Sequence, residues 1–379
     1  MLALWSAHAL AQEEELDALK FSASQSVRYD SNLFRRNTDV QSETVNITTA
    51  TMAIDKRYSL QRFELGGSVV ANRYRANENL NFNALNYRAI WHWSVTPRVH
   101  GTLSQTRRED INTFDVYREF DRNIRTETAT AAAAEYELGR DWRLLGGLTR
   151  RHRENERPTA QDGDSKQTNV AVGVRRLFPS GSFVSYRLLD GHGDYYNRVP
   201  GVSQAPTEFD QTEHEVQLSW SVTEKTRLTG TLSYLKRDHP GFPARNYSGP
   251  RGNLTAQWSA TGKVGVQLRL ARDISTYTAN NASYTTVTNL SVSPYWLVGA
   301  RTTLFASLQH GKQGFGGSLI GFTDEDRDDR NSLGLLGIRW QPIDALTLDA
   351  SLAHEQRRSS LDVYNYTNRT ARFDAKFAF

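Results

Sequence analysis

The stretch Thr212–Lys236, TEHEVQLSWSVTEKTRLTGTLSYLK, decides the fold. Apolar and polar residues alternate through its first arm, up to Val222, and again through its second arm, from Leu228 to Tyr234. Four polar residues, Thr223–Thr226, separate the two arms. Since alternate residues of a strand point to opposite faces, the stretch predicts a β-hairpin with one apolar face and one polar face.

The positions of the aromatic residues bear on what the apolar face contacts. Alternation alone fits a soluble sandwich as well as a membrane barrel. Trp220 lies near the turn and Tyr234 lies at the far end of the same apolar face. Tryptophan and tyrosine gather at the two headgroup levels when a strand crosses a membrane. The hairpin therefore favours a lipid-facing strand, with core tryptophans of a soluble sandwich or repeat protein as the alternative.

The same hairpin plan recurs along the chain and predicts about eighteen strands in an all-β, antiparallel, up-and-down transmembrane β-barrel of the outer-membrane porin type. Short turns alternate with long polar connections, and an even number of strands places both chain ends on one side, which is periplasmic in bacterial barrels. The long connections are expected at residues 31–43, 75–81, 107–121, 153–166, 190–210, 237–250, 273–283, 311–330 and 356–365.

The tryptophans and the last residue support this topology. Seven tryptophans share the apolar parity of their strands and lie close to short turns, so a periplasmic aromatic girdle is expected at Trp91, Trp93, Trp142, Trp220, Trp258, Trp296 and Trp340. Four tyrosines near the long connections, Tyr74, Tyr234, Tyr247 and Tyr366, are candidates for the second girdle. Phe379 ends an alternating aromatic strand and resembles the signal that the barrel assembly machinery reads.

Composition sets outer limits on the function. The 379 residues have a mean hydropathy of −0.61 and a net charge of +4, so neither a membrane helix nor a nucleic-acid partner is predicted. The chain has no cysteine, which fits an envelope protein without disulfides. Residues 1–11 are interpreted as the remnant of a signal peptide that ends at Ala9-Leu10-Ala11, although the basic segment is missing; an ordinary disordered N-terminus is the alternative. Residues 12–379 form the single barrel domain.

The polar parity of the strands is expected to line the lumen. Charged side chains there avoid the roughly 2–4 kcal/mol that Arg or Lys costs at the lipid midplane. Arginine predominates, which favours anionic or polyhydroxylated solutes; compensating pairs that only stiffen the wall are the alternative. The expected lumen residues are Arg62, Glu64, Arg88, His92, His100, Arg143, Arg151, Arg175, Arg187, Glu213, Glu215, Arg227, Arg269, Arg339, Asp349, Glu355, Arg372, Asp374 and Lys376.

The octet Arg28–Arg35, RYDSNLFR, directly follows the first strand and carries a family resemblance. It resembles the opening of the EpsL-type outer-membrane proteins, which accompany exosortase-linked exopolysaccharide biosynthesis, and Trp258–Lys263 and Arg272-Asp273 are also similar to that family. The resemblance implies a barrel that exports an exopolysaccharide across the outer membrane, with periplasmic export partners. It assigns no role to any single residue.

No catalytic, metal or cofactor site is expected, because the sequence has no nucleotide-binding loop, zinc spacing or nucleophile elbow. The acidic run Asp324–Asp329 is interpreted as a solvated loop, with Ca²⁺ binding as the alternative. Residues Ile111–Phe120 either fold inward as a constriction or extend the wall. The first hypothesis is an export conduit that contacts outer-membrane lipid and lipopolysaccharide; an uptake porin for small polar solutes and a structural or adhesive surface barrel are the alternatives, and an enzyme is not predicted.

Overall fold

A computed structural model describes residues 19–114, 120–198, 206–276, 284–317 and 327–379. The predicted signal peptide remnant lies outside the described residues. Within these ranges, no helix is long and apolar enough to cross a membrane.

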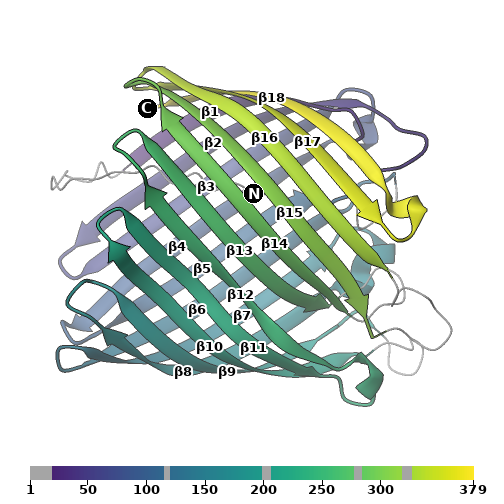
Figure 1. The fold of residues 1–379 in the computed structure, drawn as a ribbon. Coiled ribbons are helices and arrows are strands. Elements are labelled where there is room, and N and C mark those ends of the chain that lie inside the picture. The colour runs from purple at the N-terminus through teal and green to yellow at the C-terminus, as the bar shows by residue number, and fades with distance from the viewer. Residues whose placement is uncertain (1–18, 115–119, 199–205, 277–283, 318–326) are drawn as a thin grey trace.

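Eighteen antiparallel strands form one closed barrel, as the sequence predicts (Figure 1). Each strand pairs with its neighbours in sequence, and β1 also pairs with β18, which closes the ring. The strands are β1 (Leu19–Asp30), β2 (Glu43–Tyr58), β3 (Gln61–Tyr74), β4 (Phe82–Thr96), β5 (Val99–Ile111), β6 (Ile124–Leu138), β7 (Trp142–Asn155), β8 (Ser165–Leu177), β9 (Phe183–Asp194), β10 (Glu208–Thr223), β11 (Thr226–Asp238), β12 (Tyr247–Ser259), β13 (Val264–Thr276), β14 (Tyr284–Leu297), β15 (Thr302–Gly316), β16 (Asp328–Ile343), β17 (Leu346–Ser359) and β18 (Tyr366–Ala378).

The two ends of the barrel differ in their connections. Turns of two to five residues join the strands at one end, which also holds the start of β1 and the end of β18. The long connections lie at the other end. Within the described ranges, these connections contain the short 3₁₀ turns η1 (Glu78–Leu80), η2 (Pro158–Gly163), η3 (Pro243–Arg245) and η5 (Asp362–Tyr364). We call these the short-turn end and the mouth.

Several strands extend further toward the mouth than the sequence pattern indicates. The predicted connections 190–210 and 237–250 are too long, because β9 continues to Asp194, β10 starts at Glu208 and β12 starts at Tyr247. Alternation of apolar and polar residues fades there because both faces of these extensions carry polar or aromatic side chains. Because the alternation of apolar and polar residues depends on one strand face contacting lipid, it underestimates the length of these strands.

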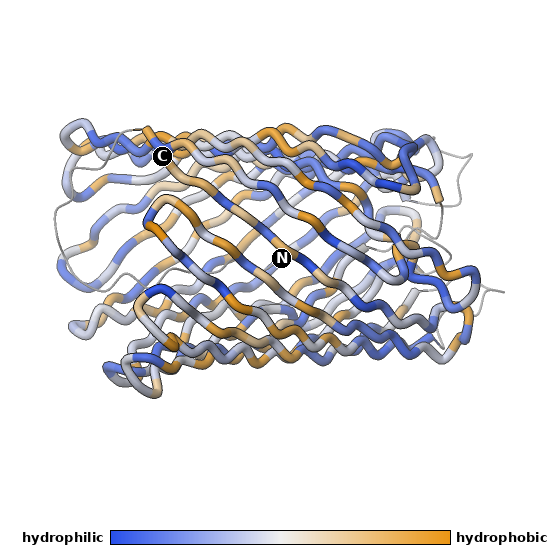
Figure 2. The backbone as a smooth tube through the Cα atoms, turned by 90° about the horizontal axis from the view of Figure 1, so that it is seen from above, coloured by the Kyte–Doolittle hydropathy of each residue, from blue (hydrophilic) through white to orange (hydrophobic). Residues whose placement is uncertain are grey.

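The two faces of the wall carry different side chains, and hydrophobic and hydrophilic residues alternate along the strands in Figure 2. Outward residues such as Val172 and Leu232 are 58% and 59% exposed, although they are large and apolar. Six of the seven predicted girdle tryptophans are 40–53% exposed, and Trp93 is half-buried. A contiguous exposed apolar surface of this kind is stable only against another apolar phase, which for a closed barrel is lipid.

The octet that carries the family resemblance has a structural role in closing the barrel. Asn368 of β18 donates to the carboxylate of Asp30 (3.0 Å) and accepts from the main-chain N–H of Asn32 (2.9 Å). Ser31 Oγ accepts from the main-chain N–H of Arg369 (2.8 Å). Asp30, Asn32 and Asn368 are at most 3% exposed. These residues form a polar latch between the first and last strands at the mouth.

Candidate functional site

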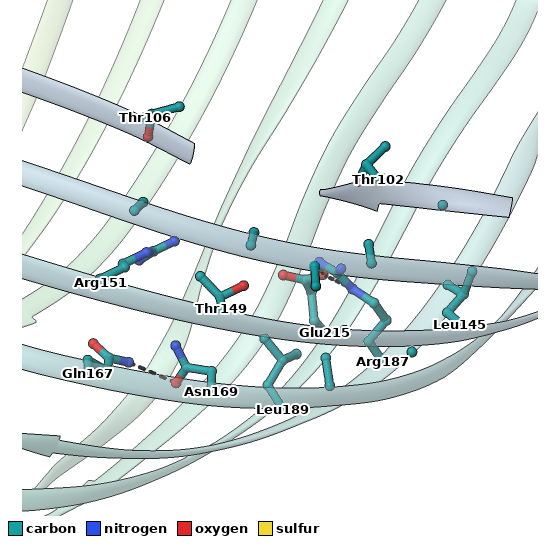
Figure 3. Close-up of a pocket in the computed structure, with 18 of the residues that line it drawn as sticks. Thr102, Thr106, Leu145, Thr149, Arg151, Gln167, Asn169, Arg187, Leu189 and Glu215 are labelled. Carbon is teal, nitrogen blue, oxygen red and sulfur yellow. Dashed lines mark hydrogen bonds and ion pairs between the residues drawn. The ribbon is translucent and has the colours of Figure 1, made fainter. Parts of the chain in front are cut away.

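The barrel encloses a cavity of about 1360 Å³, and Figure 3 shows part of its wall with Arg151 and Arg187. Its lining residues come from β2 to β13 and include nine arginines and five carboxylates, and this ratio makes the cavity wall net positive. The arginines are Arg57, Arg62, Arg108, Arg151, Arg153, Arg175, Arg187, Arg237 and Arg251, and the carboxylates are Glu127, Glu135, Glu213, Glu215 and Asp273.

Many of these charges form ion pairs between adjacent strands or between strands one apart. Arg251 on β12 binds Glu213 on β10 through two contacts of 2.8 and 2.5 Å. Arg187 on β9 binds Glu215 on the adjacent strand through Nε at 2.9 Å. These are compensating pairs of the kind that the sequence analysis gives as the alternative, and each holds two long side chains together.

Arg151 on β7 differs from these residues. It is exposed to the cavity, has no ion-pair partner among the described residues, and lies apart from the Arg187–Glu215 pair on the same part of the wall in Figure 3. Arg57, near the short-turn end, likewise has no ion-pair partner in the described chain. The guanidiniums of Arg151 and Arg57 can therefore interact with mobile anions.

The predicted lumen residues fall into three groups. Those that line the main cavity are Arg62, His92, His100, Arg151, Arg175, Arg187, Glu213 and Glu215, and Arg269 lines a smaller cavity of about 320 Å³ on β10–β14. The residues of the second group are held mainly by ion pairs or hydrogen bonds with their neighbours. The contacts are Glu64 with His92, Arg143 with Glu137 and turn carbonyls, Arg339 with Asp349, Glu355 with Arg35 and Tyr366, and Arg372 with Asp374. Arg88, Arg227 and Lys376 share the strand parity of these inward residues.

The sequence analysis missed several charged residues that line the cavity, among them Arg237 and Arg251. It treated residues 237–250 as a long connection and named no lumen residue on the strand that follows. The alternation in the sequence does extend to both residues. Arg251 has the same strand parity as Gln257, and Arg237 has the same strand parity as Arg227.

The predicted second aromatic girdle is wrong for three of its four residues. Tyr74, Tyr247 and Tyr366 are 4–5% exposed and pack on the inner side, whereas Tyr234 is 52% exposed and faces outward. The reason is parity, since Tyr74 lies an even number of residues from Arg62 on β3 and must share its face. Aromatic residues at the mouth therefore pack mainly inside the barrel.

One apolar cluster on the inner side of the mouth joins the connection after β1 to the wall. It contains Leu33, Phe34, Val45, Tyr74, Leu80, Phe82, Ala84 and Phe114. Phe34 contacts the edges of Phe114 and Phe120, with ring centroids 4.9 and 4.8 Å apart. The described residues of the segment Ile111–Phe120 thus pack against this inner cluster, while residues 115–119 lie outside the described ranges.

A second group at the mouth combines arginines with aromatic rings, and we call it the mouth cluster. It lies on β10, β11, β12 and the connections beside them. Its members are Tyr195, Arg198, Phe209, Arg237, His239, Arg245 and Tyr247, of which Tyr195, Phe209 and Arg237 line the main cavity.

The environment of the mouth cluster is strongly positive. Burial and the nearby Arg237, Arg198 and Arg245 guanidiniums lower the pKa of His239 to about 4. Burial also lowers the pKa of Arg198 and of Arg245. His239 is therefore neutral at pH 7 and the cationic charge resides on the arginines.

The acidic run is not a simple solvated loop. Asp329 is fully buried and binds Arg327 through contacts of 3.0 and 2.6 Å, while Asp324–Asp326 lie outside the described residues. On the outer surface near the mouth, His192, Asp194 and Glu208 bring possible metal-ligand atoms within 4.8 Å of one another, but all three are exposed. Exposure of this degree does not distinguish a metal site from solvated charges.

The comparisons with known proteins identify the fold. No protein-family model and no curated protein matches the sequence. Solved structures of Pseudomonas aeruginosa outer-membrane proteins are similar to almost the whole chain: OccK2 (OpdF) in complex with glucuronate has a TM-score of 0.54 and 13% identity, covering 96% of this chain and 98% of that one. OpdK with vanillate has a TM-score of 0.52 and 13% identity over 96% and 99%, and OprD has a TM-score of 0.51 and 11% identity over 96% and 97%.

These similarities place the chain in the structural class of closed 18-strand antiparallel barrels, like the OprD-type channels. At 11–13% identity they concern the fold alone. The EpsL resemblance gains no support from them.

Proposed function

We propose that this protein is an outer-membrane channel through which small anionic, polar solutes diffuse. The observation that carries this proposal is the cavity wall, on which nine arginines outnumber five carboxylates. An 18-strand barrel is too wide for its side chains to fill, so it leaves an aqueous path. Cationic side chains in a confined low-dielectric wall raise the local concentration of anions.

The structural neighbours support a selective uptake channel. Two of them were solved with small carboxylates, vanillate and glucuronate. We further propose that the outward apolar stripe contacts outer-membrane lipid, that the tryptophans form the periplasmic girdle, and that both termini are periplasmic. No chemical step is assigned to the barrel.

The proposal is tested by reconstituting the purified barrel in planar bilayers under a tenfold KCl gradient. The wild-type reversal potential should show preference for chloride. Arg151→Glu should shift it toward potassium more than Arg143→Glu does, because Arg143 is buried among Glu135, Glu137 and turn carbonyls. A non-conducting barrel, or equal shifts for both variants, would contradict the proposal.

Export of an exopolysaccharide stays the second candidate, and it rests on the sequence resemblance alone, of which the octet is the most distinctive part. Since the latch gives Asp30, Ser31 and Asn32 a structural role, the octet supports export less than the sequence suggests. Deletion of the gene separates the two candidates. Loss of surface polysaccharide with unchanged uptake of small carboxylates would favour export.

A further inference from the structure

The mouth cluster has an architecture that the diffusion channel does not require. Three arginines gather there, and none of the seven residues of the cluster is a carboxylate. Elsewhere in the cavity, arginines such as Arg187 and Arg251 are paired with a glutamate. The cluster instead combines its guanidiniums with aromatic rings.

Aromatic faces hold two of the guanidiniums in place. Arg198 lies 3.8 Å from the ring centre of Tyr195, and Arg237 lies 3.9 Å from that of Phe209. These two rings are neighbours, with centroids 5.4 Å apart. Stacking fixes the plane of a guanidinium and leaves its N–H edge for hydrogen bonds, which is the geometry that recognises a carboxylate or phosphate.

Neutral oxygens accept hydrogen bonds from both of these arginines. Arg198 donates to the main-chain carbonyls of Asp162 (2.8 Å) and Pro206 (2.6 Å). Arg237 donates to the side-chain carbonyl of Gln211 (2.5 Å). These bonds orient the guanidiniums and add no negative charge themselves, although the Asp162 carboxylate acts electrostatically on Arg198.

The backbone is shaped to seat the ring under Arg237. Phe209 lies directly opposite Gly193 in the β9–β10 pairing. A Cβ atom at Gly193 would come within 2.2 Å of the Phe209 ring, so only glycine leaves room for it. The ring is 2% exposed and is therefore a fixed platform.

His239 adds an unused polar atom. Its ring centroid lies 6.2 Å from that of Phe209 and 6.1 Å from that of Tyr247, the two rings that Arg237 also contacts. The residue is only 4% exposed, and its Nδ1 is buried with no hydrogen-bond partner in the described part of the chain. A buried polar atom without a partner is costly, and a ligand hydroxyl would satisfy it, since a neutral imidazole has one acceptor nitrogen.

We propose that the mouth cluster is a binding site for a small hydroxylated carboxylate. In this site Arg198 and Arg237 hold the carboxylate, and Nδ1 of His239 accepts a hydrogen bond from a hydroxyl of the same molecule. The aromatic faces are occupied by guanidiniums, so they position the arginines rather than stack on the ligand. This inference rests on the proposed channel function. It assigns to the mouth of the barrel a binding step that precedes diffusion.

The test measures binding separately from conduction. Equilibrium dialysis of the detergent-purified full chain uses radiolabelled lactate and propionate, two anions of similar size of which only lactate has a hydroxyl. Wild-type protein should bind lactate saturably and about tenfold more tightly than propionate, the gain of roughly one hydrogen bond to a buried acceptor. Heat-modifiable migration on gels verifies that each variant is folded.

The variants separate the two halves of the site. Arg237→Gln should weaken both anions by about tenfold or more, and Arg272→Gln, which removes an outward arginine near the mouth, should change neither. His239→Phe should abolish the preference for lactate and leave propionate binding unchanged. Phe209→Leu keeps every charge but removes the platform, and it should weaken both anions.

The results also distinguish this site from the channel. Absence of saturable binding, equal affinity of wild-type protein for both anions, or unchanged affinity in Arg237→Gln would overturn the binding site while leaving an anion-selective conductance intact. Binding with the expected preference in a barrel that does not conduct would overturn the channel and leave the site.

Discussion

The short-turn end and the mouth use aromatic residues in opposite ways. At the short-turn end, tryptophans such as Trp220 and Trp258 are about half exposed on the outer surface. At the mouth, Phe209, Tyr247 and Tyr366 are buried inside and contact arginines. In the proposed channel, outward aromatic residues position the barrel in lipid, whereas inward ones contact the arginines at the mouth.

The largest expected effect concerns the outer face. Leu232 and Thr231 are adjacent on β11, and Leu232 faces outward while Thr231 lines a cavity. Leu232→Arg should destabilise the folded barrel by up to about 4 kcal/mol, because the charge meets lipid at mid-strand. Thr231→Arg should fold normally. Urea titrations in lipid vesicles measure both, and equal losses would remove the distinction between the faces.

The polar latch gives the next largest effect. Asn368→Ala removes the amide that donates to the Asp30 carboxylate and accepts from the main-chain N–H of Asn32. We therefore expect the free energy of unfolding to fall by about 3 kcal/mol. Asn46→Ala, on the exposed outer face of β2, is the matched control and should cost little. Urea titrations in lipid vesicles measure the stability of both variants. Similar stability of the two would show that the latch does not hold β1 and β18 together at the mouth.

The smallest effect is a pH dependence confined to the mouth. The pKa of His239 is about 4 when folded and 6.5 when unfolded, so the unfolded chain binds the proton first. Stability should therefore fall as the pH drops from about 6.5 toward 4, by about 2 kcal/mol at pH 5. His239→Phe should remove this component. A variant that retains the full acid sensitivity of the wild type would refute the assignment to His239.

The sequence predicts the wall well because one rule governs it. Alternation and turn spacing predict eighteen strands, and the structure confirms them. The same rule identifies inward charges such as Arg151 and Arg187 as candidate lumen residues, and both line the cavity.

The mouth is harder to predict because lipid no longer selects one face. The sequence analysis places Tyr247 in an outer girdle because it lies near a long connection, although its strand parity indicates the inner face. Arg237 contacts Phe209 and Tyr247, which lie on the two strands beside β11, and strand register brings the three residues together. Sequence periodicity contains no information about such contacts.

The orientation of the wall is tested most directly with single cysteines, since the native chain has none. Ala171 lines the cavity and Val172, its neighbour on β8, is 58% exposed on the outer face. In intact membranes, a charged, membrane-impermeant thiol reagent should modify Ala171→Cys rapidly and leave Val172→Cys unmodified until detergent is added. Rapid modification of Val172→Cys with protection of Ala171→Cys would contradict a barrel with lipid outside and water within.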